Sequence, residues 1–545
     1  MNDLIVKLRE FVKSKGADAL LINSTNKFLT EYNQLDKNSR YKVTGFSGST
    51  GDALLTLNNL YQFVDGRYYE QADEEVNSET TVIKVPLGNS YMDSLIELVG
   101  TDNKLLVVSP KISLAIYKLL SKKLNEVSSE IIRLDTDPVE EILGKPAENS
   151  QKVFAISTEI AGVSAKDKII SLQYNFEDNE VAIITALEDV AYFTNLRSFD
   201  IPFSSTFYSR MIITKNSSCL YTDAIIDQAC FFAVKKLGDF PSDLSEIKNS
   251  QVIVDLKSIS CFDFCQLKDS NSIIESKISE YKSIKNYSEI EHFKNCFKRT
   301  DKALSIIKSM IDSQEIYSEK DYYDALVKSF YKNGALSLSF NPIVAAGTNS
   351  SIIHYSKSNE DVLVKDGDFL LVDCGAYYEG GYATDITRTF VKGKPADEQA
   401  NVYTTVLKAF ISAYCSSKYT NNTLWFDIDC NARNIVSNSE LKDYTFNHGT
   451  GHGVGIGVHE FPPSVSSSEL AKVQIKKNTV FTIEPGMYKP GVGGVRLENT
   501  VYIKETEPNV IIESLSKFPF ENKLINYEML SKEEQNWLAD WQKED

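Results

Sequence analysis

The sequence has only five histidines among its 545 residues, and it lacks features that would place it in several other classes of protein. No apolar run approaches the roughly 18 residues that a membrane-spanning helix needs. Basic residues are in the minority, because 58 Lys and Arg face 75 Asp and Glu, a net charge of −17. That balance argues against a protein whose main task is to bind phosphate. We therefore expect neither a membrane nor a nucleic acid as a partner.

Cysteine is dilute, and the first residues do not resemble a secretion signal. The closest of the eight cysteines, Cys261 and Cys265, have no second pair or nearby histidine to complete a zinc site. Charged residues interrupt the segment 3–15, so it offers no continuous apolar stretch of the kind that signal peptides contain. We expect reduced thiols and a cytoplasmic location.

The first 280 residues contain a repeated pattern that predicts two related α/β modules. Short apolar runs bounded by turn residues are typical of buried strands in a mixed sheet. The runs lie at 19–22, 53–55 and 63–66 in the first module, and at 181–184, 211–213 and 220–223 in the second. The repetition suggests a duplication. Residues 144–150, rich in turn-forming types, are the expected linker.

Beyond residue 282 the pattern predicts long helices. Apolar residues between 290 and 311 recur at helical spacing, which indicates an amphipathic helix. A second helix is expected after Pro395. Ser531, followed three residues later by Glu534, forms a capping box that announces the last helix.

Strands are expected between these helices, so the third part is of the α+β class. They are predicted at 369–373, 479–484 and 494–503. The expected domains are 1–148, 151–282 and 283–545, and the last is about as large as a single domain becomes.

Four carboxylates lie on or at the ends of predicted strands: Asp373, Glu484 and Glu498 on the strands above, and Asp385 in TDITRTF, where alternation also indicates a strand. Side chains alternate along a strand, so each carboxylate shares a face with other polar residues, and adjacent strands could bring these faces into one cavity. Four negative groups in one cavity repel one another unless cations neutralise them. Two divalent metals would do so. Oxygen ligands with one imidazole suit Mn, Fe, Co or Zn.

Three histidines occupy the glycine-rich segment HGTGHGVGIGVHE, at His448, His452 and His459. The first two are four residues apart, as in a helical HExxH zinc site. The interleaved glycines disfavour a helix, and no Glu follows His448, so that kind of metalloprotease is not expected. The spacing does not match GxGxxG either, which excludes a dinucleotide-binding loop. Glycines do allow the backbone to approach closely, so the imidazoles could reach a buried centre.

These residues carry a resemblance to the pita-bread metallopeptidases, the superfamily of methionine aminopeptidase, prolidase, creatinase and aminopeptidase P. The phrases TDITRT, HGTGHGVG…VHE and TIEPGMY…GGVRLEN resemble its X-prolyl branch. RYKVTGFSGSTGDALLTL, DGRYYEQA and TALEDVAYFTNLRSFDIPF resemble the two N-terminal modules of three-domain X-prolyl aminopeptidases. The resemblance covers nearly the whole chain. It implies two creatinase-N-like α/β modules followed by an α+β pita-bread metallopeptidase domain.

The resemblance also implies a metal site of five ligands. The family's pattern is matched in order by Asp373, Asp385, His452, Glu484 and Glu498. By this likeness Asp373 binds one metal, Asp385 and Glu498 bridge both metals, and His452 and Glu484 complete the second. Mn²⁺ is the expected ion, with Zn²⁺ and Co²⁺ as alternatives.

Further roles come from the same resemblance. Glu484 is expected to take a proton from the attacking water and pass it to the leaving proline nitrogen. His354 and His459 are expected to stabilise the oxyanion and orient the substrate. His448 and Arg496 are expected around the proline subsite. The implied substrates are peptides with proline at the second position, and the implied assembly is a homodimer.

Two more residues are interpreted as structural, and one spacing departs from the family's pattern. His292 is expected on the exposed side of a helix, and Arg388 is expected to be an ion-pair partner. Asp373 and Asp385 are twelve positions apart, one residue more than in the resembling proteins. A turn can absorb this residue, whereas an insertion within a strand would turn the ligand face away.

Two alternative functions stay open at this point. The first is an X-Pro dipeptidase, or prolidase, but prolidases usually carry one N-terminal module and this chain has two. The second is a non-catalytic binding module with the pita-bread fold. All five ligand positions are intact here, and this disfavours the second alternative.

Overall fold

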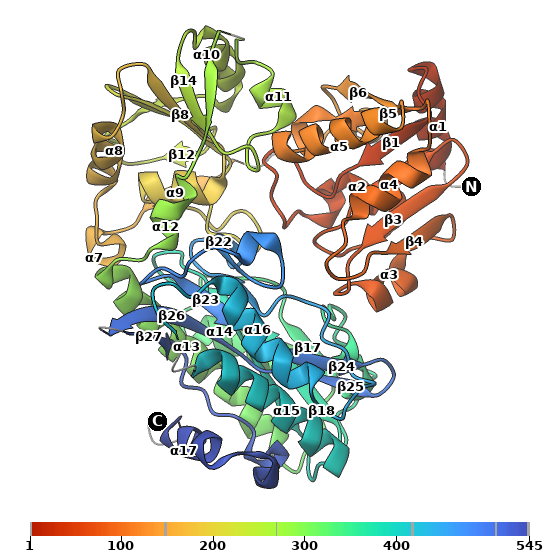
Figure 1. The fold of residues 1–545 in the computed structure, drawn as a ribbon, viewed down its shortest axis with the longest axis vertical. Coiled ribbons are helices and arrows are strands. Elements are labelled where there is room, and N and C mark those ends of the chain that lie inside the picture. Colours follow the sequence, from red (N-terminus) through yellow and green to blue (C-terminus); the bar gives the residue numbers. More distant parts are fainter. Residues whose placement is uncertain (1–2, 147–149, 269, 416–418, 507–508, 542–545) are drawn as a thin grey trace. The chain divides into compact units, whose positions relative to one another are not determined.

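The computed structural model describes residues 3–146, 150–268, 270–415, 419–506 and 509–541, and the chain divides into two compact units (Figure 1). Unit 1 comprises Met1–Ala155, Val163–Pro202 and Thr206–Ile278. Unit 2 comprises Ile156–Gly162, Phe203–Ser205 and Ser279–Asp545. In the described residues no helix is both long enough and apolar enough to cross a membrane.

Unit 1 begins with a six-stranded mixed sheet in the order β4-β3-β2-β1-β5-β6. Its central strand β1 pairs antiparallel with β2 and parallel with β5. Further out, β2 and β3 are antiparallel, while β3 with β4 and β5 with β6 are parallel. The strands are β1 (Ala19–Ile22), β2 (Ala53–Thr56), β3 (Leu60–Val64), β4 (Thr80–Lys84), β5 (Lys104–Val108) and β6 (Glu130–Leu134).

A second sheet of unit 1 repeats this arrangement strand for strand, in the order β13-β11-β10-β8-β14-β15. Its central strand β8 is again antiparallel to one neighbour, β10, and parallel to the other, β14. The outer pairs keep the same directions. The strands are β8 (Glu180–Ile184), β10 (Arg210–Thr214), β11 (Ser218–Tyr221), β13 (Ala233–Lys235), β14 (Gln251–Val254) and β15 (Ser272–Glu275). The prediction of two related mixed-sheet modules is confirmed.

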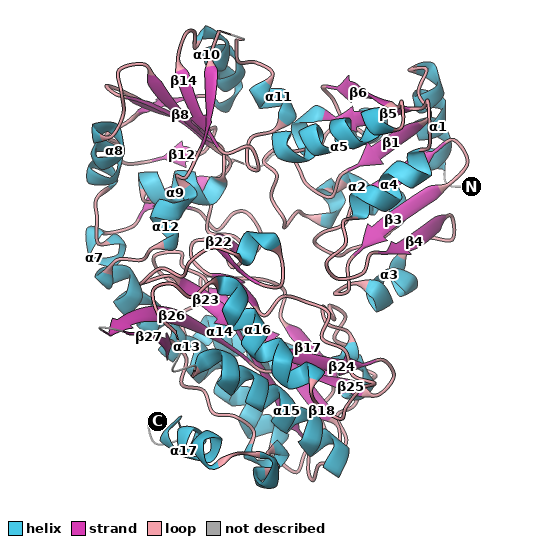
Figure 2. Ribbon diagram, in the orientation of Figure 1, coloured by secondary structure: helices cyan, strands magenta, loops and turns pink. Residues whose placement is uncertain are grey.

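Helices cover the first sheet on both faces, which explains its nearly continuous apolar strands. In β1, Ala19 and Leu21 pack with α4 and α5, and Leu20 and Ile22 pack with α1. Figure 2 shows the helices and strands of unit 1; helices separate many of its strands along the chain, but β2 runs directly into β3 and β10 into β11. They are α1 (Asp3–Ser14), α2 (Ser39–Thr44), α3 (Tyr69–Glu75), α4 (Tyr91–Val99), α5 (Leu114–Glu126), α6 (Pro138–Leu143), α8 (Ala165–Tyr174), α9 (Leu187–Thr194), α10 (Phe240–Glu246) and α11 (Cys261–Phe264).

The predicted linker 144–150 falls between α6 and a small third sheet. That sheet has the order β12-β7-β9, with β7 at Lys152–Ala155, β9 at Leu196–Arg197 and β12 at Ile225–Ile226. Residues 147–149 of the linker lie outside the described residues.

Unit 2 is built on an eight-stranded sheet in the order β17-β18-β20-β26-β23-β21-β22, with β27 paired to β26. Its strands are β17 (Ile343–Ala346), β18 (Phe369–Cys374), β20 (Ile386–Val391), β21 (Gly451–Gly453), β22 (Glu460–Val465), β23 (Val480–Ile483), β26 (Glu498–Thr506) and β27 (Asn509–Ser514). Two small two-stranded sheets pair β16 (Ser337–Leu338) with β19 (Ala376–Tyr377) and β24 (Gly486–Lys489) with β25 (Gly493–Arg496).

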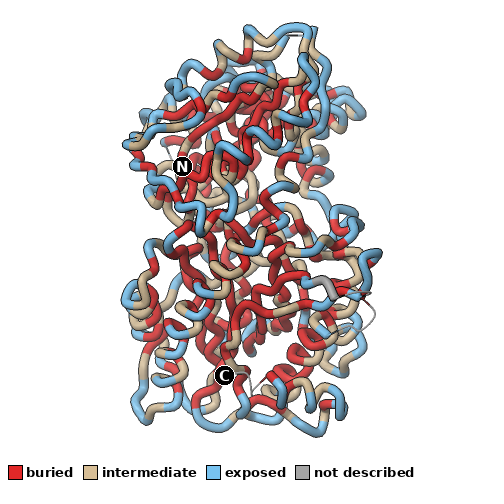
Figure 3. Tube along the Cα trace, turned by 90° about the vertical axis from the view of Figure 1, so that its left-hand side faces the viewer, coloured by how far each residue is buried: buried red, intermediate tan, exposed pale blue. Residues whose placement is uncertain are grey.

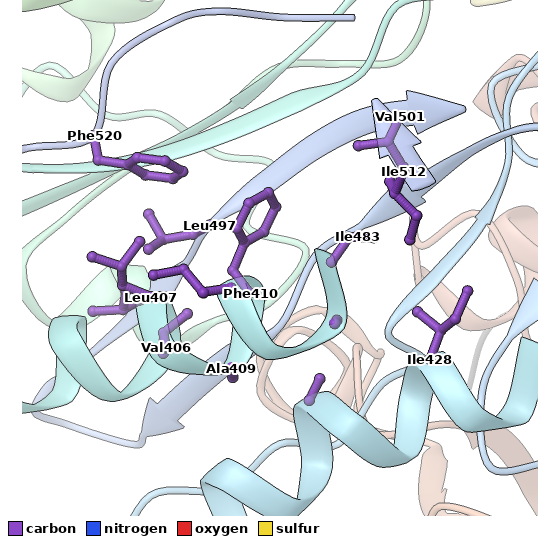
Figure 4. Packing of buried hydrophobic residues seen from close by; sticks show 14 of the residues in the cluster. Val406, Leu407, Ala409, Phe410, Ile428, Ile483, Leu497, Val501, Ile512 and Phe520 are labelled. Carbon is purple, nitrogen blue, oxygen red and sulfur yellow. The ribbon is translucent and has the colours of Figure 1, made fainter. Parts of the chain in front are cut away.

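Two hydrophobic cores of unit 2 flank this sheet. Apolar residues of α15 and α16 pack with those of β23, β26 and β27; Figure 4 shows Phe410 among Leu497, Ile483 and Phe520. A second core joins α13 and α14 to β17, β18 and β20. Buried residues follow the strands, and exposed ones follow the outer loops (Figure 3). The helices are α7 (Thr158–Ala161), α12 (Ser279–Ser283), α13 (Tyr287–Ile311), α14 (Glu319–Lys332), α15 (Asp397–Tyr414), α16 (Trp425–Ser437) and α17 (Lys532–Trp541).

The predicted helices of unit 2 are confirmed, and one predicted strand is wrong in its extent. Both hydrogen bonds of the capping box before α17 form, because Ser531 N donates to Glu534 and Glu534 N donates to Ser531 Oγ. The segment 494–503 is two strands, β25 and β26, that part at Leu497. β25 pairs with β24, whereas β26 pairs within the large sheet. The alternation of side chains between the two faces therefore does not run continuously from one strand into the other.

Candidate metal centre

Two of the predicted ligands come from the antiparallel pair β18 and β20. Asp373 lies opposite Thr387, and the pairing runs without a break from Phe369 with Val391 to Cys374 with Ile386. Asp385 directly precedes β20, and its carbonyl accepts a hydrogen bond from Thr500 Oγ1 at 2.8 Å. The connection between the two acids therefore adds no bulge to the β18–β20 pairing, which keeps its register up to Cys374 and Ile386.

Two further carboxylates come from β26 and the end of β23. Glu498 lies opposite Thr387, whose Oγ1 donates to Glu498 Oε2 at 2.7 Å. Glu484 follows β23 just before Pro485, where the strand ends. Its amide donates to the carbonyl of Thr450 at 2.8 Å, and Thr482 Oγ1 donates to Glu484 Oε1 at 3.2 Å. Adjacent strands thus bring all four acids to one side of the sheet.

The imidazole of His452 joins this group from β21. Its Nε2 lies 3.6 Å from Asp385 Oδ2 and 3.4 Å from Glu484 Oε1. Its Nδ1 lies 3.0 Å from the Gly453 carbonyl, which can only accept, so Nδ1 carries a proton, and a neutral imidazole of this tautomer offers Nε2 to a metal. The neighbouring Gly451 is required by packing, since a Cβ there would come within 1.9 Å of the Thr482 carbonyl oxygen.

The residues present fit divalent cations. Asp385, His452 and Glu498 each offer one ligand atom, and these atoms lie within 4.8 Å of one another. Burial, and then the neighbouring carboxylates, raise the pKa of Asp385 and of Glu498 well above the usual range. Asp373 Oδ1 is buried and has no hydrogen-bond partner among the described residues. Cations placed there would neutralise the acids and complete that oxygen's coordination. We call the five residues Asp373, Asp385, His452, Glu484 and Glu498 the ligand cluster.

Arg496 is fully buried and reaches the ligand cluster. Its Nη2 donates to Asp373 Oδ2 at 2.6 Å, and its Nε donates to Thr387 Oγ1 at 3.2 Å. Its Nη1 donates to the hydroxyl of Tyr488 at 2.9 Å. The guanidinium therefore neutralises part of the cluster and fixes the orientation of Asp373.

His448 is connected to Arg496 through a tyrosine that the sequence reasoning did not single out. Tyr488 accepts from Arg496, so its hydroxyl proton is free to be donated to His448 Nε2 at 2.9 Å. His448 Nδ1 lies 2.8 Å from the Gly449 carbonyl and 3.9 Å from Glu484 Oε2. Tyr488 stands in the quoted phrase TIEPGMY, four residues after Glu484, and this position was the available signal.

The other two candidate histidines lie on neighbouring segments. The ring of His459 meets that of His452 edge to face, with centroids 4.6 Å apart, and His459 is exposed. His354 is half-buried and follows Ile353, whose carbonyl accepts from Arg496 Nη1 at 3.3 Å. The structure therefore places His448 and His459 beside cluster ligands, and it places the backbone next to His354 against Arg496.

A buried acid fixes the segment that carries His448. Asp429, fully buried in α16, accepts from Arg433 Nε at 2.7 Å and from Thr450 Oγ1 at 2.6 Å. Arg433 also donates to the carbonyls of Phe446 and His448. Asp429 and Arg433 both lie in α16, but the residues that they hold lie on a later segment of the chain. No pattern in the sequence indicates these contacts.

A second buried acid fixes the segment that carries His354. Glu319, at the start of α14, accepts from the amide of Ala346 at 2.6 Å and from that of Asn359 at 3.2 Å. The hydroxyl of Tyr355 donates to it at 2.7 Å and Asn349 Nδ2 at 3.0 Å. Four donors thus hold this carboxylate. Three of them lie between β17 and β18, so the carboxylate also fixes that connecting segment.

Two structural interpretations need correction. His292 is half-buried rather than exposed: its Nε2 bonds the Glu379 carbonyl and its ring packs on Tyr382. Burial lowers the pKa of His292. Arg388 is fully buried and donates to the backbone carbonyls of four residues, namely Thr387, Glu498, Phe518 and Pro519. Within the described part of the chain its partners are carbonyls and not the expected carboxylate.

Three family models together match most of the chain. The model of metallopeptidase family M24 matches residues 291–505. Models of the creatinase/prolidase N-terminal domain match residues 5–141 and 144–289.

Relatives with the same span are known. The chain is 28% identical over 581 residues to a protein of Laccaria bicolor named "Probable Xaa-Pro aminopeptidase P", covering all of this chain and 89% of that protein. It is 29% identical over 595 residues to a Paracoccidioides lutzii protein of the same name, with 98% and 94% covered.

A solved structure has the same fold over the full length. The X-prolyl aminopeptidase from Caenorhabditis elegans, described as a cytosolic enzyme with a di-nuclear active site, matches with a TM-score of 0.91 at 22% identity. The match covers 99% of this chain and 95% of that one. The chain therefore contains a metallopeptidase domain of family M24 at residues 291–505, with two creatinase/prolidase N-terminal domains ahead of it.

Proposed function

We propose that this chain is a metal-dependent aminopeptidase that hydrolyses the bond between an N-terminal residue and a following proline. The observation that carries the proposal is the ligand cluster, in which buried acids and one imidazole share a single small volume. Its specificity is argued from the full-length likeness to proteins named Xaa-Pro aminopeptidase P. The proposed domains are 1–148, 151–282 and 283–545.

We propose that the ligand cluster holds two divalent metal ions, and that these are Mn²⁺. Asp373 would hold one ion, and His452 and Glu484 would hold the other. Asp385 and Glu498 would each contact both ions. Bound there, two such ions supply Lewis acidity that activates water as a nucleophile near neutral pH. Zn²⁺ and Co²⁺ suit the same donor set.

Glu484 is suited to moving a proton. In the metal-free protein, burial raises its pKa from the usual 4.5 to about 7, against the opposing influence of Arg496. With metal bound the carboxylate is deprotonated, so it can accept a proton as a general base and then release it. In this proposal Glu484 takes the proton of the attacking water and delivers it to the proline nitrogen that leaves.

The accessory histidines orient the substrate. His354 and His459 donate to the carbonyl oxygen as negative charge develops on it. His448 and Arg496 are fixed by Tyr488 and border the proline subsite and the metals. The substrates are peptides with proline at the second position, acted on by a cytoplasmic homodimer.

The test is a cleavage assay on a peptide of the form Xaa-Pro-Pro, longer than two residues. The purified protein should release the first residue, lose this activity with a chelator and regain it with Mn²⁺. Cleavage of Xaa-Pro dipeptides alone would instead identify a prolidase. Metal binding without turnover on either substrate would contradict the enzymatic function.

A further inference from the structure

The 453–460 loop, which carries His459, is held by a hydrogen bond to the carboxylate of Glu460, its own last residue. Gly453 pairs with Glu460 across the loop, next to an irregularity in the pairing of β21 with β22. Glu460 Oε2 accepts from the amide of Ile456 at 3.0 Å, so the acid bonds the loop that it terminates. His459 is the residue immediately before it. Its backbone is therefore held between this bond and the start of β22.

This carboxylate is neutralised by a lysine from a distant segment. Lys285 Nζ lies 2.5 Å from Glu460 Oε1, and both side chains are almost fully buried, at 2% and 1% exposure. Lys285 precedes α13, and its amide donates to the Asn478 carbonyl at 2.9 Å. A buried ion pair needs both partners, because removing one leaves an uncompensated charge.

A second lysine and a glycine complete the arrangement. Lys282 Nζ donates to the Phe461 carbonyl at 3.1 Å, on the other side of Glu460. A Cβ at Gly455 would come within 2.1 Å of Glu460 Oε2, so the loop leaves room for the carboxylate only with glycine there. The ring of His459, held at this loop's end, meets His452 of the ligand cluster.

We infer that Glu460 and Lys285 are the positioning residues of His459: their buried ion pair holds the 453–460 loop so that this imidazole faces the substrate carbonyl. The inference deepens the proposed function and rests on it for the catalytic role of His459. Neither residue touches the reacting atoms, so both act through His459. In Glu460→Gln the loop keeps an acceptor for Ile456 but loses the charge that Lys285 needs.

The kinetic test compares Glu460→Gln, Lys285→Met and Lys285→Arg with the wild-type protein in the Xaa-Pro-Pro assay. We expect kcat to fall about 10- to 100-fold in the first two, with KM within about threefold. Lys285→Arg keeps the charge and should rescue kcat to within about threefold. The double variant Glu460→Gln/Lys285→Met removes both charges, so no unpaired charge is buried and the protein should fold. Its kcat should still be lower than that of the wild-type protein.

Non-additivity separates positioning from a general loss of stability. In a His459→Ala background, Glu460→Gln should lower kcat by less than about twofold, since the imidazole it positions is gone. The matched control is Lys111→Met, which breaks a similarly buried pair with Asp137 (2.5 Å) in unit 1. That variant should melt at a lower temperature with kcat unchanged.

A second readout does not depend on activity. The five histidines allow selective isotope labelling, and in Glu460→Gln the imidazole resonances of His459 should shift while those of His292 stay in place. Wild-type kcat in both Glu460→Gln and Lys285→Met, additive losses in the His459→Ala background, or an unmoved His459 resonance would overturn the inference. A wild-type protein that cleaves no Xaa-Pro peptide would overturn the proposed function instead, and the resonance shift would still decide the positioning.

Discussion

Two groups of buried acids in unit 2 differ in which donors and cationic side chains neutralise their charges. We call Glu319, Asp429 and Glu460 the anchor acids, because each bonds a segment that carries an accessory histidine. Glu319 accepts from four donors, while Asp429 and Glu460 accept from two each, one of which is an Arg or a Lys. In the ligand cluster four carboxylates share one guanidinium, that of Arg496.

The difference shows what each group is suited for. Burial raises the pKa of Glu319 as well, but four hydrogen bonds oppose it. Carboxylates that have their donors stabilise the fold and fix loops. Carboxylates that have few donors and lie beside other carboxylates are costly to bury in the charged form, and bound cations offset this cost. Metal binding is thus coupled to the stability of unit 2.

The largest effect is expected from removing a ligand. Asp385→Asn should lower turnover on the order of 10³-fold or more, because in the proposed centre this carboxylate would hold both metals. In the metal-free protein the same change removes a repelling charge, so the melting temperature should stay constant or rise. Cleavage assays and metal-free calorimetry measure the two effects. A clear fall in metal-free stability would place Asp385 with the anchor acids.

Removing the metals should make stability depend on pH. The folded state raises the pKa of Glu484 from 4.5 to about 7, so between these values it holds a proton that the unfolded chain has released. Stability of the metal-free protein should therefore fall as pH rises through this window. With metal bound the acids are already deprotonated, and the trend should disappear or reverse. Melting curves from pH 5 to 8 with and without metal test this, and identical slopes would contradict it.

Removing an anchor acid's charge should mainly cost stability. Asp429→Asn weakens the bonds to Arg433 and Thr450 and should destabilise the protein by about 1–3 kcal/mol. Metal content should not change. Denaturant unfolding with metal analysis provides the measurement. An unchanged midpoint together with lost metal would show that Asp429 acts on the ligand cluster directly.

The smallest effect is expected from the connection between Asp373 and Asp385. Deleting Glu379 shortens the turn outside the β18–β20 pairing and removes the contact with His292. Stability should change by about 1 kcal/mol or less, and metal content should stay at the wild-type level. Loss of metal would mean that the turn helps to set the position of Asp385.

Much of the site could be predicted from the sequence because strand alternation is local. Asp385 and Thr387 share one face of β20, while Ile386 and Phe390 pack into the helical core, as the pattern of apolar residues predicts. The resemblance then named five ligands that the structure places on neighbouring strands.

What the sequence could not predict depends on contacts between distant residues. The Lys285–Glu460 pair joins positions 175 apart, and the bond of Arg496 to Asp373 spans 123. No local periodicity encodes such partners. The break at Leu497 escaped prediction because β25 and β26 follow each other with only this residue between them, and only their pairing with different strands separates them.

The most direct test of the account is a calorimetric titration of the chelator-treated protein with Mn²⁺, with cleavage of an Xaa-Pro-Pro peptide measured at each addition. We expect two bound ions per chain in the wild-type protein, full activity only when both are present, and fewer than two ions in Asp385→Asn. A wild-type stoichiometry below two at full activity, or two ions still bound by Asp385→Asn, would contradict the assignment of a dinuclear centre to the ligand cluster.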